Sequence, residues 1–385
     1  MLKRMFQLYD YSIVVAVFLL SLFGLIMVYS SSMVVAVSRF EVDADFFFAK
    51  QRMSLILATV AFFVTMVLPY RLYFRLFKLI AFGSIILLGL VYVIGKTAGN
   101  AQSWISLGLY NLQPGEFVKI SVIIYLAAIY SKKQTYINDF GTAVLPPLVF
   151  ILIIFAQVFF QPDLGTAVLI AMIAVVITFS SGMNIMNIGK LLLLGGGALA
   201  AIIPLAINAG ALSDEQLSRF GAAYNPFSDP LGDGHQLINS YIAIGSGGVT
   251  GVGLGNSNQK YGFLPESHTD FIMAVISEEL GILGVGFVIL LLSFIVIKGF
   301  LLARKCHDPF GSLLAIGIAS MIGIQACVNL GALTGLLPIT GVPLPFVSYG
   351  GSSLLALMAS VGILVNISMF VNYQKDKLKN QGIAA

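Results

Sequence analysis

The chain has 385 residues, of which 58% are hydrophobic and only 10% are charged, with a formal net charge of +4. A soluble domain carries about 25% charged and about 45–50% apolar residues, so this composition excludes an ordinary soluble protein. Lys and Arg lie mainly on alternate loops, which gives no support for a nucleic-acid partner, and two cysteines, Cys306 and Cys327, do not make a disulfide framework.

Long apolar segments alternate with short polar ones along the chain, as in an all-α polytopic integral membrane protein. We therefore predict a single membrane domain over residues 1–385 with about ten transmembrane helices, each near the ~20 residues that a bilayer core requires. The first predicted transmembrane helix lacks the small-residue cleavage site of a signal peptide, so we expect it to be retained in the protein. The predicted spans are 11–33, 52–69, 74–95, 116–131, 144–160, 165–182, 189–208, 270–297, 310–334 and 350–372.

The basic residues predict the orientation of these spans. Fourteen lie on one side, six on the other, and Lys119 lies inside a span, which accounts for all 21. The side with fourteen is expected to be cytoplasmic and to hold both termini. Residues 209–269 then form a large extracytoplasmic loop between the seventh and eighth spans.

Three ionisable residues stand at the starts of predicted spans. Glu116 and Lys119 begin the fourth span, and as i,i+3 neighbours they can pair with each other. Asp163, in "QPDLGT", precedes the sixth span and is a candidate helix-start acid. The histidines lack the spacing of metal ligands, so they predict no metal site.

The loop 209–269 contains an amphipathic stretch, Gln236 to Ile244, that is too short to span a bilayer and is expected to lie along the outer interface. The glycine-rich run "GSGGVTGVGLG" follows it. A dinucleotide fingerprint needs a preceding strand and a following helix in a βαβ unit, so we expect a flexible, tightly packed loop instead of a phosphate site.

The stretch "FLPESHTDFIMAVISEELG", residues 263–281, places several ionisable groups at the start of the eighth span. Ser267-His268-Thr269-Asp270 matches the capping box of a helix start, and this pattern supports a cap and a catalytic acid equally for Asp270. At ~100° per residue, Asp270 shares one helix face with the small residues Ala274, Ser277 and Gly281. Such a face suits a cavity better than lipid.

Glu278 and Glu279 follow in the same span, roughly 12 and 13 Å deeper at 1.5 Å per residue. Ionisable groups at such depth are candidates for a functional role. For both residues we expect pairing with lysine or with the backbone of neighbouring helices in preference to direct catalysis.

Six motifs occur in a fixed order along the chain. They are "QPGE" (113–116), "QPDLGT" (161–166), "NPFSDPLGDGHQ" (225–236), "IAIGSGG" (242–248), "FLPESHTDF" (263–271) and "LLPITGVPLPFVSYGGSS" (336–353). Together they resemble the SEDS family (shape, elongation, division and sporulation) of bacterial FtsW and RodA proteins over nearly the whole chain. The details look closest to division-type FtsW of Gram-positive bacteria. Two positions depart from the family pattern, Ser103 before Trp104 and His235 before Gln236.

The resemblance implies a peptidoglycan glycosyltransferase that polymerises lipid II, an undecaprenyl-pyrophosphate-linked disaccharide, into β-1,4 glycan strands with release of undecaprenyl pyrophosphate. The family's essential acid matches Asp270, which is the expected catalytic base. For the pyrophosphate, the candidates in decreasing preference are Arg219, Lys119 and Lys260. The other residues of the predicted substrate-binding set are Glu116, Gln236, Glu266, His268 and Ser348.

The alternatives are a lipid II flippase, a RodA-like elongation polymerase and a structural scaffold for division proteins. The chain lacks the transpeptidase combination of S-x-x-K with K-T-G, so the resemblance implies a class B penicillin-binding protein as crosslinking partner, beside other divisome proteins. Its contact is expected on the eighth and ninth spans. The expected location is the bacterial cytoplasmic membrane at the division septum. No cofactor is expected with certainty, and a divalent cation, Mg or Mn, is left open.

Overall fold

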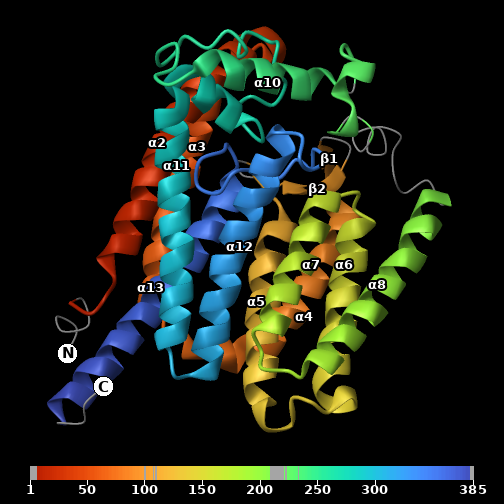
Figure 1. The fold of residues 1–385 in the computed structure, drawn as a ribbon, viewed down its shortest axis with the longest axis vertical. Helices are drawn as coiled ribbons and strands as arrows, with labels where there is room; N and C mark the ends of the chain where they lie inside the picture. Colours follow the sequence, from red (N-terminus) through yellow and green to blue (C-terminus); the bar gives the residue numbers. More distant parts are fainter. Residues whose placement is uncertain are drawn as a thin grey trace.

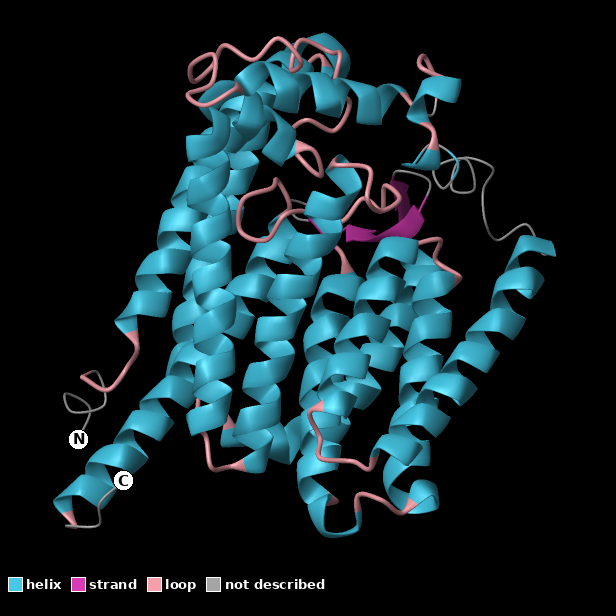
Figure 2. Ribbon diagram, in the orientation of Figure 1, coloured by secondary structure: helices cyan, strands magenta, loops and turns pink. Residues whose placement is uncertain are grey.

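The computed structural model describes residues 7–98, 101–106, 108, 111–208, 221, 223–232 and 234–381. In these parts each of the ten predicted spans is a helix, and the helices form one bundle (Figures 1 and 2). Eight are long and apolar enough to cross a membrane, whereas Leu164–Phe179 and Ile185–Ala198 are shorter apolar helices. The predicted all-α polytopic membrane fold is confirmed. The helices are α2 (Tyr11–Phe40), α3 (Phe46–Val67), α4 (Arg71–Ile94), α5 (Pro114–Lys132), α6 (Leu145–Phe159), α7 (Leu164–Phe179), α8 (Ile185–Asn208), α11 (Ile272–Lys305), α12 (Pro309–Leu333) and α13 (Gly351–Asn380).

The two ends of the bundle differ in what they carry. Helix α10 (His235–Gly247) lies across one end, here named the α10 end, as Figure 1 shows. The start of α2 and the end of α13 lie at the other, here named the termini end. The amphipathic stretch in the large loop is therefore a helix, and it lies across the α10 end of the bundle. Basic residues such as Arg71, Lys132 and Lys305 lie beside the turns of the termini end, in keeping with the predicted cytoplasmic side.

Helices α3 and α13 pack side by side and bring the second and last spans together. A Cβ on Gly362 of α13 would lie 2.1 Å from Thr65 Oγ1 and 2.5 Å from the Phe62 carbonyl oxygen of α3. Only glycine permits this approach. Small residues have this role in membrane bundles, where no hydrophobic force drives helices together.

A small antiparallel sheet joins α4 to α5 at the α10 end (Figure 2), and the sequence analysis did not predict it. Its strands are β1 (Lys96–Ala98), β2 (Ala101–Ser106) and β3 (Asn111–Leu112), in the order β1-β2-β3. In β2, Ser103 and Ile105 are buried, whereas Trp104 and Ser106 are half-buried. This alternation is too short to separate from a loop in the sequence alone.

Helix α11 is interrupted at Gly281, whose φ of 62° and ψ of −156° are not helical. The glycine-rich loop fills the break: Val252 N donates to Glu278 O at 2.9 Å, and Ile282 N donates to Gly248 O at 3.1 Å. A Cβ on Gly281 would lie 2.5 Å from Gly251 N. The expectation of a tightly packed loop is confirmed, and in the described part of the chain this loop follows helix α10 and not a strand.

The capping box predicted for Ser267 and Asp270 is wrong. Helix α11 begins at Ile272 with Phe271 as its N-cap, and Ser267 Oγ donates instead to the Ser31 carbonyl of α2 at 3.1 Å. The chain turns at Glu266, whose φ is +56° and whose carbonyl accepts from Phe271 N at 3.3 Å. Asp270 thus lies before the helix, and the face drawn from Asp270 to Gly281 does not exist.

Candidate active site

Asp270 lies at the α10 end, where the turn 265–271 enters α11. Its main-chain oxygen accepts from Asn329 Nδ2 of α12 at 2.7 Å. Its carboxylate faces Gly341, where an added Cβ would be 3.7 Å from Asp270 Oδ2. The residue is half-buried, which leaves part of it open to a ligand.

The segment that follows α12 fixes the chain next to Asp270. Ser348 Oγ donates to the Thr269 carbonyl at 2.6 Å and accepts from Leu344 N at 2.8 Å, while Tyr349 N donates to the His268 carbonyl at 2.9 Å. The structure therefore gives Ser348 a role in holding two main-chain segments together. Its predicted contact with substrate stays a prediction.

Gln51 of α3 supports the same segment from the other side. Its Nε2 donates to the Ser348 carbonyl at 3.3 Å, and its Oε1 accepts from Gly350 N at 3.2 Å. The turn that carries Asp270 is thus attached to α3 through Ser348.

His268 is buried between two aromatic rings, with Phe47 at 4.5 Å and Tyr349 at 5.6 Å between centroids. Burial lowers the pKa of His268, the charge of Glu266 raises it and that of Arg39 lowers it, with a net decrease. The ring is therefore neutral at neutral pH, two residues before Asp270.

Glu266 and Gln236 border the site differently. The Glu266 carboxylate is 44% exposed and lies 3.8 Å from Arg39, so it faces solvent. Gln236 Nε2 donates to the Pro265 carbonyl at 3.2 Å and thereby attaches α10 to the turn. Both residues are half-buried, and their predicted contacts with substrate stay predictions.

The predicted pairing of Glu116 and Lys119 is confirmed. Lys119 Nζ donates to Glu116 Oε1 at 3.0 Å and to Gln325 Oε1 of α12 at 3.0 Å, and both charged side chains are buried. Gln325 Nε2 donates onward to the Pro343 carbonyl at 2.9 Å. The ion pair is therefore linked to the segment that Asp270 faces.

Asp163 is the N-cap of α7, as expected for a helix-start acid. Its carboxylate accepts from Thr166 N at 3.0 Å and from Gln113 Nε2 at 3.1 Å. Helix capping is therefore enough to explain why an acid stands at position 163.

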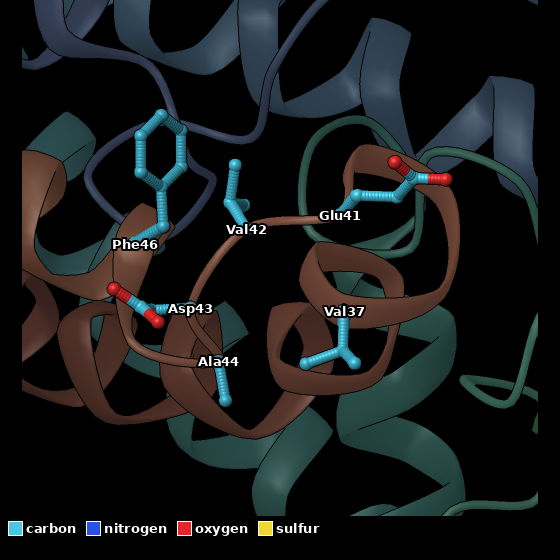
Figure 3. Close-up of a pocket in the computed structure, with 6 residues that line it drawn as sticks. All are labelled: Val37, Glu41, Val42, Asp43, Ala44 and Phe46. Atoms are coloured by element: carbon cyan, nitrogen blue, oxygen red, sulfur yellow. The ribbon is translucent and has the colours of Figure 1, made fainter.

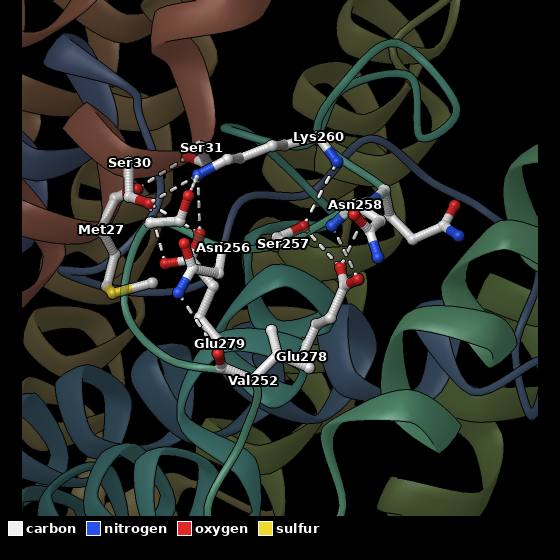
Figure 4. Close-up of polar contacts among 12 residues, drawn as sticks. Met27, Ser30, Ser31, Val252, Asn256, Ser257, Asn258, Lys260, Glu278 and Glu279 are labelled. Atoms are coloured by element: carbon white, nitrogen blue, oxygen red, sulfur yellow. Dashed lines mark hydrogen bonds and ion pairs between the residues drawn. The ribbon is translucent and has the colours of Figure 1, made fainter.

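Lys260, Glu278 and Glu279 form a polar network beside the break in α11 (Figure 4). Lys260 Nζ lies 3.0 Å from Glu279 Oε1, 2.6 Å from the Gly255 carbonyl and 3.3 Å from Ser30 Oγ. The expected pairing of Glu279 with lysine is confirmed. The three donors of Lys260 are engaged inside the protein, which contradicts its prediction as a pyrophosphate contact.

Glu278 holds the loop that precedes the site. Its carboxylate accepts from Ser257 Oγ, from Asn258 N at 2.9 Å and from Gln259 N at 3.3 Å. Backbone partners were expected for Glu278, and they come from the loop instead of a neighbouring helix. Arg219, the first candidate for the pyrophosphate, lies outside the described residues.

An open hollow at the turn between α2 and α3 is separate from these residues (Figure 3). It is lined by Val37, Glu41, Val42, Asp43, Ala44 and Phe46. The carboxylates of Glu41 and Asp43 point apart, and none of the predicted site residues lines it. We therefore place the site at Asp270 and not in this hollow.

Sequence reasoning missed Gln51, Gln325 and Asn329, which hold the segments around Asp270. Gln51 stands between Lys50 and Arg52 near the start of α3, where the sequence gives no signal. Gln325 and Asn329 are uncharged amides inside an apolar span and are i,i+4 neighbours on α12. An amide pair on one face of a span was the available signal, because a polar group at that depth needs a partner. In the described part of the chain, no group of three or more His, Cys, Asp or Glu residues could hold a metal ion.

Comparison with known proteins identifies relatives along the whole chain. The probable peptidoglycan glycosyltransferase FtsW of Bacillus subtilis is 53% identical over all of this chain and 96% of its own length. Stage V sporulation protein E of the same organism is 39% identical over 94% of this chain and 98% of its own.

Two solved structures share the fold. One, described as structural coordination of polymerization and crosslinking by a peptidoglycan synthase complex, has a TM-score of 0.74 and 28% identity over 95% of this chain and 99% of its own. The rod shape determining protein RodA of Thermus thermophilus has a TM-score of 0.68 and 26% identity, and the match covers 94% of this chain and 96% of the RodA chain. The model of the FtsW/RodA/SpoVE family, described as "Cell cycle protein", matches residues 10–373. This chain therefore belongs to the FtsW/RodA/SpoVE family, as its six motifs predicted.

Proposed function

We propose that this membrane protein is a division-type peptidoglycan glycosyltransferase that polymerises lipid II, with Asp270 as its catalytic base. The relatives named FtsW are called peptidoglycan glycosyltransferases. The observation that carries the role of Asp270 is its place: a half-buried acid before α11, with its main chain held by Asn329 and its carboxylate facing Gly341. The nearby acids Glu278 and Glu279 are fully buried, at 1% and 0% exposed.

The chemistry needs one base at this place. The 4-hydroxyl oxygen of the acceptor GlcNAc attacks the anomeric carbon of the donor MurNAc, and its proton passes to the Asp270 carboxylate. The bond from that carbon to the pyrophosphate breaks, and its electron pair leaves with undecaprenyl pyrophosphate. A sugar hydroxyl is a weak nucleophile at neutral pH, so a base within hydrogen-bond reach contributes about 10²–10⁴-fold. A single displacement converts the α-linked donor into a β-1,4 linkage.

The leaving pyrophosphate requires positive charge. Arg219 is the proposed contact, and Lys119 is second because its ammonium already binds Glu116 and Gln325. In the described residues, no group of three or more His, Cys, Asp or Glu could hold a metal ion. We propose a divalent cation, Mg or Mn, only as a counter-ion held mainly by the pyrophosphate oxygens, as Mg²⁺ is in many phosphate sites.

The setting proposed for this reaction is the outer face of the cytoplasmic membrane at the division septum, with both termini cytoplasmic. The proposed crosslinking partner is a class B penicillin-binding protein, in contact with α11 and α12, among other divisome proteins. Support comes from the basic turns at the termini end and from the related synthase complex, whose description joins polymerization with crosslinking.

The test is polymerisation of labelled lipid II by the purified protein with its partner. Asp270→Asn should elute as a folded, partner-binding protein and make no glycan ladder. Because Asp270 precedes the helix, loss of a helix cap cannot account for this result. Asp43→Asn, an exposed acid in the α2–α3 turn, is the matched control and should polymerise normally. Glycan ladders from folded Asp270→Asn would remove Asp270 from the mechanism, and a wild-type protein that only translocates lipid II would favour the flippase.

A further inference from the structure

Two amide side chains on α12, Gln325 and Asn329, lie one helical turn apart and face the same segment, 340–344. Both are buried, with Asn329 only 1% exposed. A buried amide without hydrogen bonds is costly, so its partners indicate why the chain keeps it in an apolar span.

Asn329 uses both of its N–H donors on main-chain oxygens. Nδ2 donates to Asp270 O at 2.7 Å and to Val342 O at 2.8 Å. These two carbonyls belong to segments that are far apart in the sequence. A single nitrogen atom, Asn329 Nδ2, donates a hydrogen bond to each of them and so links the two segments. Gly341, beside Val342, is the residue that the Asp270 carboxylate faces.

Gln325 repeats the arrangement one turn earlier. Its Nε2 donates to the Pro343 carbonyl at 2.9 Å, and its Oε1 accepts from Lys119 Nζ at 3.0 Å. The segment 340–344 is therefore fixed to α12 at two consecutive carbonyls, Val342 and Pro343. Only the bond from Asn329 continues to Asp270.

We propose that Asn329 is a positioning residue for Asp270, because it fixes the main chain of the acid to the segment 340–344. The inference rests on the proposed function, since it acts through the base. Without this amide, the turn 265–271 keeps its ties through Ser348 and Tyr349 at residues 268 and 269, but the main chain at Asp270 loses its bond to α12. A displacement of about 1 Å at a reacting group can cost about 10²-fold in rate.

The test compares Asn329→Leu and Asn329→Ala with Asn366→Leu. Asn366 is an equally buried asparagine at the termini end, where its Nδ2 donates to Met66 O at 2.7 Å and its Oδ1 accepts from Tyr70 N at 2.9 Å. The readouts are the thermal midpoint in detergent, partner binding, and kcat and KM for lipid II polymerisation, each normalised to folded protein. Asn329→Ala, which removes the amide without adding a buried charge or volume, carries the test if Asn329→Leu does not fold.

We expect the Asn329 variants to lose at least about tenfold in kcat with little change in KM. Asn366→Leu should lower the thermal midpoint and leave the kcat of the folded protein unchanged. A folded Asn329 variant with wild-type kcat, or one whose KM rises as much as its kcat falls, overturns the inference. If Asp270→Asn is inactive in the same assay while the Asn329 variants are active, only this inference fails. Activity of Asp270→Asn removes both.

Discussion

Helix α11 takes part in two ion pairs of equal length in different surroundings. Near the α10 end, Glu279 lies 3.0 Å from Lys260, and the two side chains are 0% and 1% exposed. Near the termini end, Lys298 lies 3.0 Å from Asp10, and these side chains are 33% and 28% exposed. The first pair binds a long loop to the helix, whereas the second joins the start of α2 to α11 where both side chains are partly exposed. Although the two N–O distances are equal, the buried pair and the partly exposed pair should contribute differently to the free energy of unfolding.

The difference shows where the fold depends on specific partners. Charges removed from water must be compensated completely, and removing one partner of a buried pair leaves the other uncompensated. Exposed charges keep water as an alternative partner. The α10 end, with Asp270, should therefore be more sensitive to single substitutions than the termini end.

The largest effect is expected from Lys260→Met, which leaves the Glu279 carboxylate buried with Ser30 as its remaining partner. We expect a loss of about 3–5 kcal/mol in the free energy of unfolding, measured by denaturant titration in detergent. The double variant Lys260→Met/Glu279→Leu should recover much of it, because no charge then remains buried. Equal stability of the single variant and the wild type would contradict a buried, energetically coupled pair.

A pH titration separates the two ends. Because the pKa of His268 is lowered by burial, the unfolded chain, whose histidine pKa is about 6.5, takes up a proton at a higher pH than the folded protein does. Stability should therefore be full above pH 6.5 and fall as the pH decreases toward 5. For Asp10, burial raises the pKa, but the bonds from Ser12 and Lys298 lower it more. The termini end should lose stability only at a pH near or below the 3.8 of an ordinary aspartate.

The matched variant for this titration is His268→Gln, which has no titrating ring. Its thermal midpoint between pH 7.5 and pH 5 should vary less than that of the wild type. If both proteins show the same slope, His268 is not the group responsible.

The smallest effect is expected from Lys298→Met. Its pair is partly exposed, so the loss should be about 0–1 kcal/mol and should shrink with added salt. The same denaturant titration measures it. A loss as large as that of Lys260→Met would show that exposure does not distinguish the two pairs.

The spans could be predicted because a bilayer imposes one requirement on every apolar segment. The helices at 114–132 and 309–333 lie within two residues of their predictions. Pairings within one helix turn, such as Glu116 with Lys119, could also be predicted because their spacing fixes their distance.

What the sequence did not reveal depends on contacts between distant segments. The pattern at Ser267 matches a cap, yet its hydroxyl binds Ser31 of α2. Lys260 appeared available for an anion, but Glu279 and Gly255 occupy it. The bonds from Asn329 to Asp270 and Val342 join three segments, and no local pattern contains such a geometry.

Because Gly281 interrupts helix α11, the rotation of the residues before the break about the helix axis does not fix the rotation of the residues after it. In a continuous helix, one inserted residue would turn everything beyond it by ~100°. Here the part that follows Asp270 is fastened to the glycine-rich loop through Val252 and Gly253. The same loop also holds the first residue beyond the break, because Ile282 N donates to Gly248 O. The loop thus sets the direction of the remaining span relative to the segment that presents the acid, and a longer or shorter loop should change that direction.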